Sequence, residues 1–502
     1  NKPQNLSPAG GEGVGTCRPV TLATFRMSRE VRLCQGCARS AHPQGLALIE
    51  AGLPAIANVL LWGFHKMHPA LLCRGKFLPK TPQLRSDRMH VKTILNRIEK
   101  QPGFIYDTCK WRDSGPPALV ITLRPQAGNK PICSKCGQRG PGYDMLRVRS
   151  FAFVPLWGIP VFFLYAPRRV QCPICGVKVE KLPWAVGKSH LTLSYAWFLA
   201  TWCKRLSWKE VAEVFQTSWD TVFRSVEMAV NWGLAHRDID GITAIGIDEI
   251  CWRKRKDKFV TLVYQLDQGK RRLLWIGPDR TAKTFREFFD WLGAARSRQL
   301  RFICSDMWKP YLAVIAEKAT GAVNILDRFH IMSHMSKAID EVRAEETKEL
   351  KKKGKEPLLT KSRWCLLKRP EKLTEKQVVR LKDLLACNLR TVRAYLLKED
   401  FQRFWGYRYP AWAGKFLDAW CTRTMRSKIK PMKKVAKMLR AHRPLLLNWF
   451  RAKNTIALGC VEGFNNKAKV VTKRSYGFRT YDGLKIALYH GLGDLPVPQG
   501  TH

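Results

Sequence analysis

The pattern of apolar and polar positions changes several times along the chain, and each change marks a predicted module. Residues 89–187 alternate apolar with polar or β-branched positions, which is typical of strands separated by turns. Residues 188–238 and 336–455 instead repeat apolar positions at helical spacing. Between these helical regions, residues 239–335 alternate short apolar strands with amphipathic helices. The last region, residues 456–496, opens with a further helical pattern.

The order of elements in residues 239–335 predicts the fold of this region. Strand TAIGIDEI comes first, and KFVTLVYQLD with RRLLWIGPD then predicts a hairpin around Gly269. TAKTFREFFDWLG predicts an amphipathic helix capped by Thr281, and RFICSD, KPYLAVIAEKA and AVNILDRFH predict strand, helix and strand. This β-β-β-α-β-α-β order is the RNase H-like pattern within the α/β class. We expect a multidomain α/β protein whose RNase H-like core is interrupted by an all-helical insertion.

The predicted insertion, residues 336–455, has two further features. Its Trp-rich section, FQRFWGYRYPAWAGKFLDAW, predicts the core of a helix bundle more than a surface that stacks on DNA bases. Its lysine run, KELKKKGKE, predicts a solvated loop. Residues 456–496 would then return to the core and complete it.

Residues 1–88 differ from the remainder of the chain. They begin at Asn1 without a methionine, contain Gly- and Pro-rich patches, and show no sustained helical or strand period. Met89 then opens the more regular sequence HVKTILNRIEKQPGF. We expect translation to begin natively at Met89 and residues 1–88 to be a non-native or poorly ordered upstream extension.

The amino-acid composition indicates the kind of partner that the chain binds. The 502 residues include 88 Lys and Arg against 40 Asp and Glu, a formal charge of +48. This excess predicts salt-sensitive attraction to a nucleic acid; a solubilising surface or a ribosome-type RNA binder is the alternative. The 16 cysteines are mostly scattered, and we expect no signal peptide, which favours a reducing cytosol over a secreted disulfide scaffold. The longest apolar stretches are broken by proline, so we expect no membrane span.

Two cysteine pairs predict a structural metal site in residues 89–187. Cys133 and Cys136 lie in PICSKCGQ, and Cys172 and Cys175 lie in VQCPICGV. A C-x2-C turn aims two thiolates at one ion, and four thiolates complete the tetrahedral shell that structural Zn²⁺ takes. Such a closed shell has no open position, so we assign it no catalysis; two pairs of buried free cysteines are the alternative.

A helix-turn-helix is predicted in residues 188–238. Ser207 can cap WKEVAEVF, and Thr217 or Ser218 can begin WDTVFRSVEMAV after a short connection. In a DNA-reading motif the start of the second helix faces the groove. The candidate DNA contacts are therefore Trp219, Asp220, Thr221 and Arg224.

Three acidic residues, remote from one another in sequence, carry the candidate chemistry. Asp248 and Asp306 each end an apolar strand, and Glu462 lies in a predicted helix after the insertion. Carboxylates gathered inside a basic protein repel one another, so such a group is tolerable mainly around a cation. Mg²⁺ (or Mn²⁺) held among them would favour phosphodiester chemistry. Glu249 is adjacent to Asp248 but would point to the opposite side of the strand.

The helix that carries Glu462 offers further candidate contacts. Asn466, Lys469 and Lys473 follow Glu462 at offsets that place all four on one helical face, where the two lysines could grip phosphates. Asp327 and His330 form D-x2-H after the last strand. This pair is either a supporting active-site pair or a strand-end hydrogen bond, and the sequence favours neither.

Over about residues 89–496 the chain resembles bacterial insertion-sequence transposases of the DDE type, specifically the ISL-three group. The cysteine-rich finger, the helix-turn-helix, GIDEI, CSDMWKPY, LDRFH and VEGFNNKAKVVTKRSYGFRTYDGL occur in the family's order. The resemblance implies that Asp248, Asp306 and Glu462 are the catalytic acids, and Lys469 resembles a lysine that follows the glutamate in many DDE enzymes. Residues 1–88 depart from the family's pattern.

This resemblance implies a DNA transposase of the bacterial cytoplasm that acts at the nucleoid. It would bind the terminal inverted repeats of its element as a homo-oligomer, cleave the element ends and transfer their 3′-hydroxyl strands into target DNA. Two alternatives remain open. A catalytically silent DNA-binding relic or repressor would need only the finger and the helix-turn-helix, and an RNase H-like structure-specific nuclease would cleave without joining.

Overall fold

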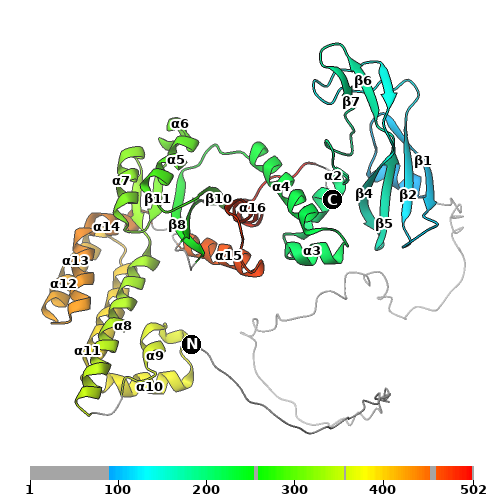
Figure 1. Cartoon of the computed structure of the whole chain (residues 1–502). Coiled ribbons are helices and arrows are strands. Elements are labelled where there is room, and N and C mark those ends of the chain that lie inside the picture. The colour runs from blue at the N-terminus through cyan, green and yellow to red at the C-terminus, as the bar shows by residue number, and fades with distance from the viewer. Residues whose placement is uncertain (1–89, 254–257, 355–357, 453–458, 500–502) are drawn as a thin grey trace, which may run out of the picture. The chain divides into compact units, whose positions relative to one another are not determined.

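The computed structural model describes residues 90–253, 258–354, 358–452 and 459–499 (Figure 1). The predicted extension 1–88 and its boundary at Met89 lie outside the described residues. Among those described, no helix combines the length and the apolar character that crossing a membrane requires.

The first group of elements is a β module that follows helix α1 (Val91–Ile98). One sheet has four strands in the order β1-β2-β5-β4, and a second has three in the order β3-β6-β7. Alternate residues of the larger sheet are buried, among them Phe151 and Phe163, and they pack with Trp184. The strand bounds are β1 (Phe104–Trp111), β2 (Leu119–Pro125), β3 (Gly142–Met145), β4 (Arg149–Leu156), β5 (Ile159–Tyr165), β6 (Arg168–Cys172) and β7 (Gly176–Val179).

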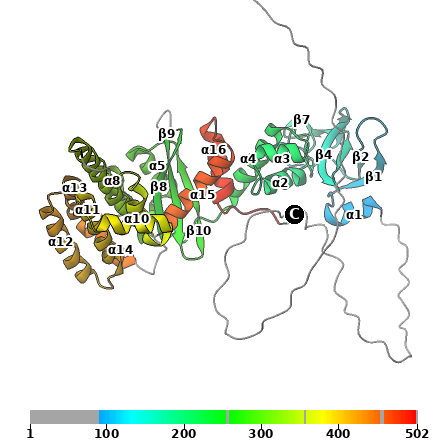
Figure 2. The same ribbon diagram turned by 90° about the horizontal axis from the view of Figure 1, so that it is seen from below.

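Three helices follow, α2 (Leu193–Trp202), α3 (Trp208–Val214) and α4 (Trp219–His236), grouped together in Figure 2. The predicted cap at Ser207 is present as a full capping box, because the Ser207 hydroxyl and the Glu210 carboxylate each accept a backbone N–H of the other residue. Of the two predicted starts for the second helix, Ser218 is the one used, and its hydroxyl accepts the N–H of Thr221.

A five-stranded sheet with the order β10-β9-β8-β11-β12 follows. The first three strands along the chain pair antiparallel, and β11 is parallel to both β8 and β12. The element order is the predicted β-β-β-α-β-α-β, with one short extra helix. The bounds are β8 (Ala244–Arg253), β9 (Lys258–Asp267), β10 (Lys270–Gly277), α5 (Ala282–Leu292), α6 (Ala294–Ser297), β11 (Phe302–Ser305), α7 (Lys309–Lys318) and β12 (Val323–Leu326).

The last predicted strand, AVNILDRFH, is shorter than its sequence indicated. β12 ends at Leu326, and Asp327 caps the next helix by accepting the N–H of Phe329. A short side chain that binds a backbone N–H two residues ahead competes with strand pairing, which is why the strand stops there.

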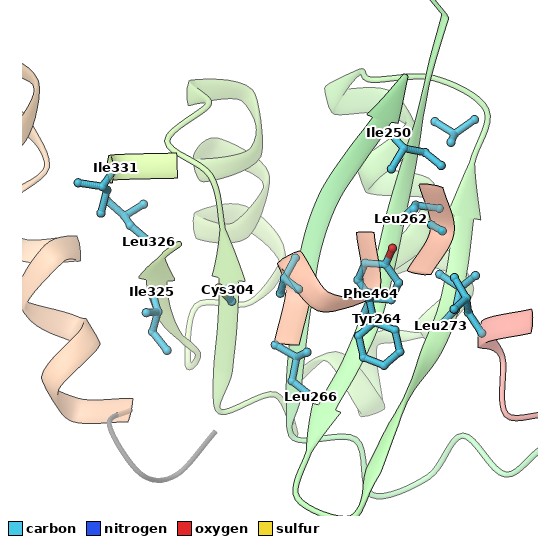
Figure 3. Packing of buried hydrophobic residues seen from close by; sticks show 14 of the residues in the cluster. Ile250, Leu262, Tyr264, Leu266, Leu273, Cys304, Ile325, Leu326, Ile331 and Phe464 are labelled. Atoms are coloured by element: carbon cyan, nitrogen blue, oxygen red, sulfur yellow. The ribbon is translucent and has the colours of Figure 1, made fainter. Parts of the chain in front are cut away.

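Each face of the five-stranded sheet has its own apolar core, since neighbouring residues of a strand point to opposite faces. Ile245 and Ile247 pack with Phe285 and Tyr311 from α5 and α7. Ile250, Leu262 and Leu266 point to the other face, where Figure 3 shows Phe464 lying against Tyr264.

Helices occupy the region between β12 and the returning segment. They are α8 (Arg328–Lys352), α9 (Arg363–Leu367), α10 (Glu375–Leu385), α11 (Arg390–Phe401), α12 (Pro410–Arg426), α13 (Lys430–Ala441) and α14 (Arg443–Ala452), with short 3₁₀ turns at Pro370–Lys372 and Gln402–Gly406. Trp405 and Trp420 are buried in the core, as predicted, although Trp412 is exposed. The lysine run does not form the predicted loop through Lys352, because α8 continues to that residue and places cations at its negative C-terminal end.

Helix α15 (Cys460–Arg474) returns to the five-stranded sheet and is followed by α16 (Tyr481–Leu492). The close approach of α15 to β8 depends on Gly246. A Cβ atom at this position would lie 2.4 Å from Cγ2 of Val461 and 2.9 Å from Cδ1 of Leu266. The glycine therefore removes the one side chain that would separate the returning helix from the strand carrying Asp248.

The first prediction concerns this contact. Gly246→Ala should lower the free energy of unfolding by about 1–3 kcal/mol, because the added methyl overpacks the interface between β8 and α15. Denaturant unfolding of the full chain measures the change. Gly321→Ala is the matched control, since a Cβ at Gly321 meets no atom within 4 Å. Equal stability of the two variants would contradict the packing argument.

Candidate functional site

Parallel pairing of β8, β11 and β12 brings three aspartates to the edge of the sheet where β11 and β12 end. Asp306 and Asp327 directly follow those two strands, but the prediction that Asp248 ends its strand is wrong, because the pairing of β8 with β9 continues to Arg253. Cys304 of β11 pairs with Gly246 of β8, and Ser305 pairs with Leu326 of β12. Two residues beyond Gly246 is Asp248, and the residues directly after Ser305 and Leu326 are Asp306 and Asp327. Parallel register therefore aligns acids that are distant in sequence.

Asp248, Asp327 and His330 form a tight group at this edge. One ligand atom from each lies within 4.8 Å of the others. Nε2 of His330 is 3.4 Å from Oδ2 of Asp248. Asp248 and Asp327 are buried, and His330 is half-buried on the first turn of α8. The D-x2-H pair is thus part of the same cluster as Asp248, in addition to the strand-end hydrogen bond that Asp327 makes to Phe329.

The pKa shifts in this cluster express its excess of negative charge. Burial raises the pKa of Asp327 to about 6. The hydrogen bond from the backbone N–H of Phe329 lowers this pKa, whereas the negative charges of Asp248 and Glu462 raise it further. Burial alone would lower the pKa of His330, but its hydrogen bond and charge interaction with Asp248, helped by Asp327 and Asp306, raise that pKa to about 9. The raised pKa of His330, which its carboxylate neighbours cause, indicates a site that favours a positive charge.

Asp306 lies beside this cluster with its two carboxylate oxygens already engaged. Oδ2 accepts a hydrogen bond of 3.1 Å from Nη2 of Arg280, and Oδ1 accepts the backbone N–H of Trp308 at 2.9 Å. Arg280 also holds Glu249, with its Nε 2.6 Å from Oε1 of that residue. The guanidinium therefore neutralises two carboxylates at once.

Glu249 points away from Asp248, as predicted from strand alternation. Its partner Arg280 precedes α5, whereas Asp248 contacts α8 and α15. Burial and the nearby charge of Asp306 raise the pKa of Glu249 to about 7, although Arg280 acts in the opposite direction. Sequence reasoning missed Arg280, because nothing in its local pattern indicates that it reaches two strands.

Glu462 lies in the first turn of α15 and is half-buried. It is near enough for its charge to raise the pKa of Asp327, but its carboxylate is not among the ligand atoms that lie within 4.8 Å of one another. The structure therefore brings Asp248 together with Asp327 and His330. It places Asp306 and Glu462 beside that group without joining them to it.

Asn465 was not predicted, yet it links α15 to Asp248. Its side-chain N–H donates to Oδ2 of Asp248, and its Oδ1 accepts the hydroxyl of Tyr264 at 2.9 Å. The signal was present in the sequence: Val461, Phe464 and Ala468 mark the buried face of the helix, and Asn465 is the polar residue on that face. A buried amide with both ends bonded fixes the orientation of Asp248.

The four predicted zinc ligands also converge. Ligand atoms of Cys133, Cys136, Cys172 and Cys175 lie within 4.8 Å of one another, and Sγ of Cys136 is 3.4 Å from Sγ of Cys172. Each pair is followed by a glycine with positive φ, Gly137 at 77° and Gly176 at 70°, which permits the tight turn. Backbone N–H groups of Cys136 and Lys135 lower the pKa of Cys133 to about 7. Four sulfur donors fit the tetrahedral ligand set of Zn²⁺.

The predicted DNA contacts of the helix pair lie at the start of α4. Trp219 is exposed and stacks on Phe223, and Thr221 donates its N–H to the Ser218 cap. Asp220 and Arg224 form an exposed ion pair of 2.9 Å. Arg224 therefore has an anionic neighbour already, which reduces the charge it offers to a phosphate.

The predicted face of α15 is accessible. Asn466, Lys469 and Lys473 are all exposed, and Glu462 at the start of the same face is half-buried. Cations on this face would lie along the same helix as the acid.

Comparisons with known proteins agree with the resemblance noted in the sequence. A family model described as "Transposase", of the ISL3 group of DDE enzymes, matches residues 245–488. The chain is 27% identical over 400 residues to the transposase for insertion sequence element IS1001 of Bordetella parapertussis, covering 79% of this chain and 97% of that protein. It is 29% identical over 424 residues to the transposase for insertion sequence element IS1557 of Mycobacterium tuberculosis, covering 78% and 92%. The resemblance to ISL3-group insertion-sequence transposases is confirmed.

The second prediction concerns the protonation of His330 in metal-free protein. Because folding raises its pKa from 6.5 to about 9, His330 contributes stability that is complete below pH 6.5 and is lost as the pH rises through 9. The contribution is roughly 3 kcal/mol. The difference in unfolding free energy between wild type and His330→Asn, measured in buffer without added Mg²⁺ or Mn²⁺, should therefore shrink between pH 6 and pH 9.5.

Leu396→Ala serves as the control for this experiment, because Leu396 is exposed on α11, lies outside the cluster and does not titrate. Its effect on stability should be the same at both pH values. An equally pH-independent effect of His330→Asn would show that the imidazole is not held by the acids.

Proposed function

We propose that this chain is a DNA transposase that binds the terminal inverted repeats of an insertion sequence, cleaves its ends and transfers the 3′-hydroxyl strands into target DNA. The observation that carries the proposal is the alignment of Asp248, Asp306 and Asp327 at one sheet edge, with Glu462 on the helix packed against it. The family match and the transposase relatives support the same reading.

Asp248, Asp306 and Glu462 are the proposed catalytic acids, with Asp327 and His330 as a supporting pair. The donor set fits a hard divalent cation, because carboxylate oxygens suit Mg²⁺ and the addition of an imidazole suits Mn²⁺ as well. An ion bound there would lower the pKa of an attacking water or hydroxyl and offset charge on the leaving oxygen. His330 and Asn465 would hold the Asp248 carboxylate in place.

Asp306 has a further requirement in this proposal. Its Oδ2 is bound to Arg280, so Asp306 shares an ion with Asp248 only after it exchanges that partner. Arg280 would remain paired with Glu249 on the other side of the strand. In the described structure the guanidinium supplies the positive charge that offsets both carboxylates.

DNA recognition is assigned to the modules outside the sheet. Trp219, Asp220, Thr221 and Arg224 at the start of α4 would face the terminal repeat, as in helix-turn-helix proteins. Asn466, Lys469 and Lys473 would hold phosphates near the acids. Zn²⁺ at the four cysteines would fix the fold of the β module. A homo-oligomer acting on paired ends at the bacterial nucleoid completes the proposal.

The third prediction tests catalysis. Asp248→Asn should reduce metal-dependent cleavage of terminal-repeat DNA by about a thousandfold or more while binding of the same DNA is retained, because the amide keeps the shape but not the charge. The matched control is Asp290→Asn, an exposed acid on α5 whose partner is Lys318. A strand-transfer assay on the same ends separates the transposase from a nuclease that only cleaves and from a silent binding protein. Retained cleavage in Asp248→Asn would overturn the assignment.

The fourth prediction tests the cysteine site. Cys136→Ser should lose bound zinc and leave the β module open to protease, since metal binding and folding of such modules are one equilibrium. Cys251→Ser is the control, because Cys251 is exposed and lies outside the cluster. Metal analysis together with limited proteolysis measures both effects. Full zinc content and full protection in Cys136→Ser would exclude the four-thiolate site.

A further inference from the structure

A cavity of about 410 Å³ lies between α2, α4, β10, α15, α16 and the segment after α16. Its basic lining residues come from three separate parts of the chain: Lys204 follows α2, Arg271 lies on β10, and Lys467 lies on α15. All three are exposed. This volume is sufficient for a sugar-phosphate unit, so the cavity is large enough to be a binding site rather than a packing defect.

The three cations have no acidic partner within ion-pair distance in the part of the chain that the structure describes. Asp494 is the one acidic residue of the lining. His490, the remaining ionisable group, adds no charge at neutral pH, because burial and the nearby Lys204 and Arg474 lower its pKa to about 4. Unpaired like charges that converge on one cavity favour an anion there.

The aromatic residues of the lining decide which part of a nucleic acid fits. Tyr264 stacks on the Phe464 ring with a centroid distance of 4.8 Å (Figure 3), and the Lys467 ammonium lies over the same ring at 5.6 Å. Trp197 is buried and packs edge-to-face on Trp232. Neither ring is a free platform for a base, so the cavity offers cations to a phosphate and little to a base.

The position of the cavity in the fold indicates how phosphate binding there could contribute to DNA binding. Lys204 lies between α2 and α3, three residues before the Ser207 cap, and Lys467 lies five residues after Glu462 on α15. Arg474, at the other end of α15, donates hydrogen bonds to the carbonyl oxygens of Cys203 and Arg205, which fixes α15 to the end of α2. The cavity therefore lies where the proposed DNA-reading helices join the helix that carries the acid.

We propose that this cavity binds backbone phosphate of duplex DNA, independently of sequence, through Lys204, Arg271 and Lys467. It would hold the strand that runs from the helix-turn-helix toward the acids, and so rests on the proposed function in taking DNA as the ligand. The site is distinct from the exposed face of α15 that carries Lys469 and Lys473, since Lys467 lines the cavity together with residues of α2 and those two lysines do not.

The test is the salt dependence of DNA binding by the full, zinc-loaded chain, measured with a random-sequence duplex and a terminal-repeat duplex in buffer without added Mg²⁺ or Mn²⁺. Lys204→Gln/Lys467→Gln should reduce the slope of log affinity against log salt by about 2 on both duplexes, because each lost phosphate contact removes about 0.9. At about 0.1 M salt the affinity should fall on the order of tenfold.

The matched control is Arg286→Gln/Lys318→Gln, which removes two positive charges that already pair with Glu317. Lys467→Arg should retain the wild-type slope, which separates a loss of charge from a loss of fold. Equal slopes in the cavity variant and the control would overturn the proposal. Because no cleavage is measured, a catalytically inactive chain would still show the change in slope.

Discussion

The candidate site depends on electrostatic repulsion between carboxylates at one edge of the five-stranded sheet. Parallel pairing of β8, β11 and β12 fixes where Asp248, Asp306 and Asp327 lie, so three carboxylates gather at one edge of the sheet, where like charges repel one another. The chain offsets this with a protonated His330 against Asp248 and with Arg280 between Asp306 and Glu249. Both cations come from the protein itself: His330 lies within the group formed with Asp248 and Asp327, and Arg280 lies beside it between Asp306 and Glu249.

The remainder of the site depends on a segment that returns from far along the chain. Helix α15 reaches β8 because Gly246 leaves room for Val461, and it is oriented by Phe464 on Tyr264 and by Asn465 on Asp248. The same helix carries Glu462 at its start and Arg474 at its end, where Arg474 binds the carbonyl end of α2. One rigid helix thus connects the acidic edge to the helices proposed to read DNA, and lysines along its length supply charge between them.

Much of this arrangement was predictable from local sequence. The features that were not predicted depend on contacts between residues far apart in the chain. Strand and helix order followed from hydrophobic period, and caps such as Ser207 and Thr281 marked helix starts because a hydroxyl beside free N–H groups is a local interaction. The two C-x2-C turns also brought their sulfur atoms together as expected. Arg280 and Asn465 escaped prediction because their roles arise from partners in other elements, and Asp327 shortened a predicted strand because its side chain caps α8. The roles of the acids and the boundaries of the domains remain predictions.

The central claim is that Asp248 and a second acid bind the same divalent ion. Anomalous diffraction from crystals of the full chain grown with Mn²⁺ and element-end DNA tests this claim most directly. The proposal predicts an ion with an oxygen of Asp248 at about 2.2 Å, a second carboxylate from Asp306 or Glu462 on the same ion, and Arg280 bound to Glu249 alone. An ion that does not contact Asp248, or a crystal in which Asp306 still holds Arg280 while Mn²⁺ binds elsewhere, would contradict it.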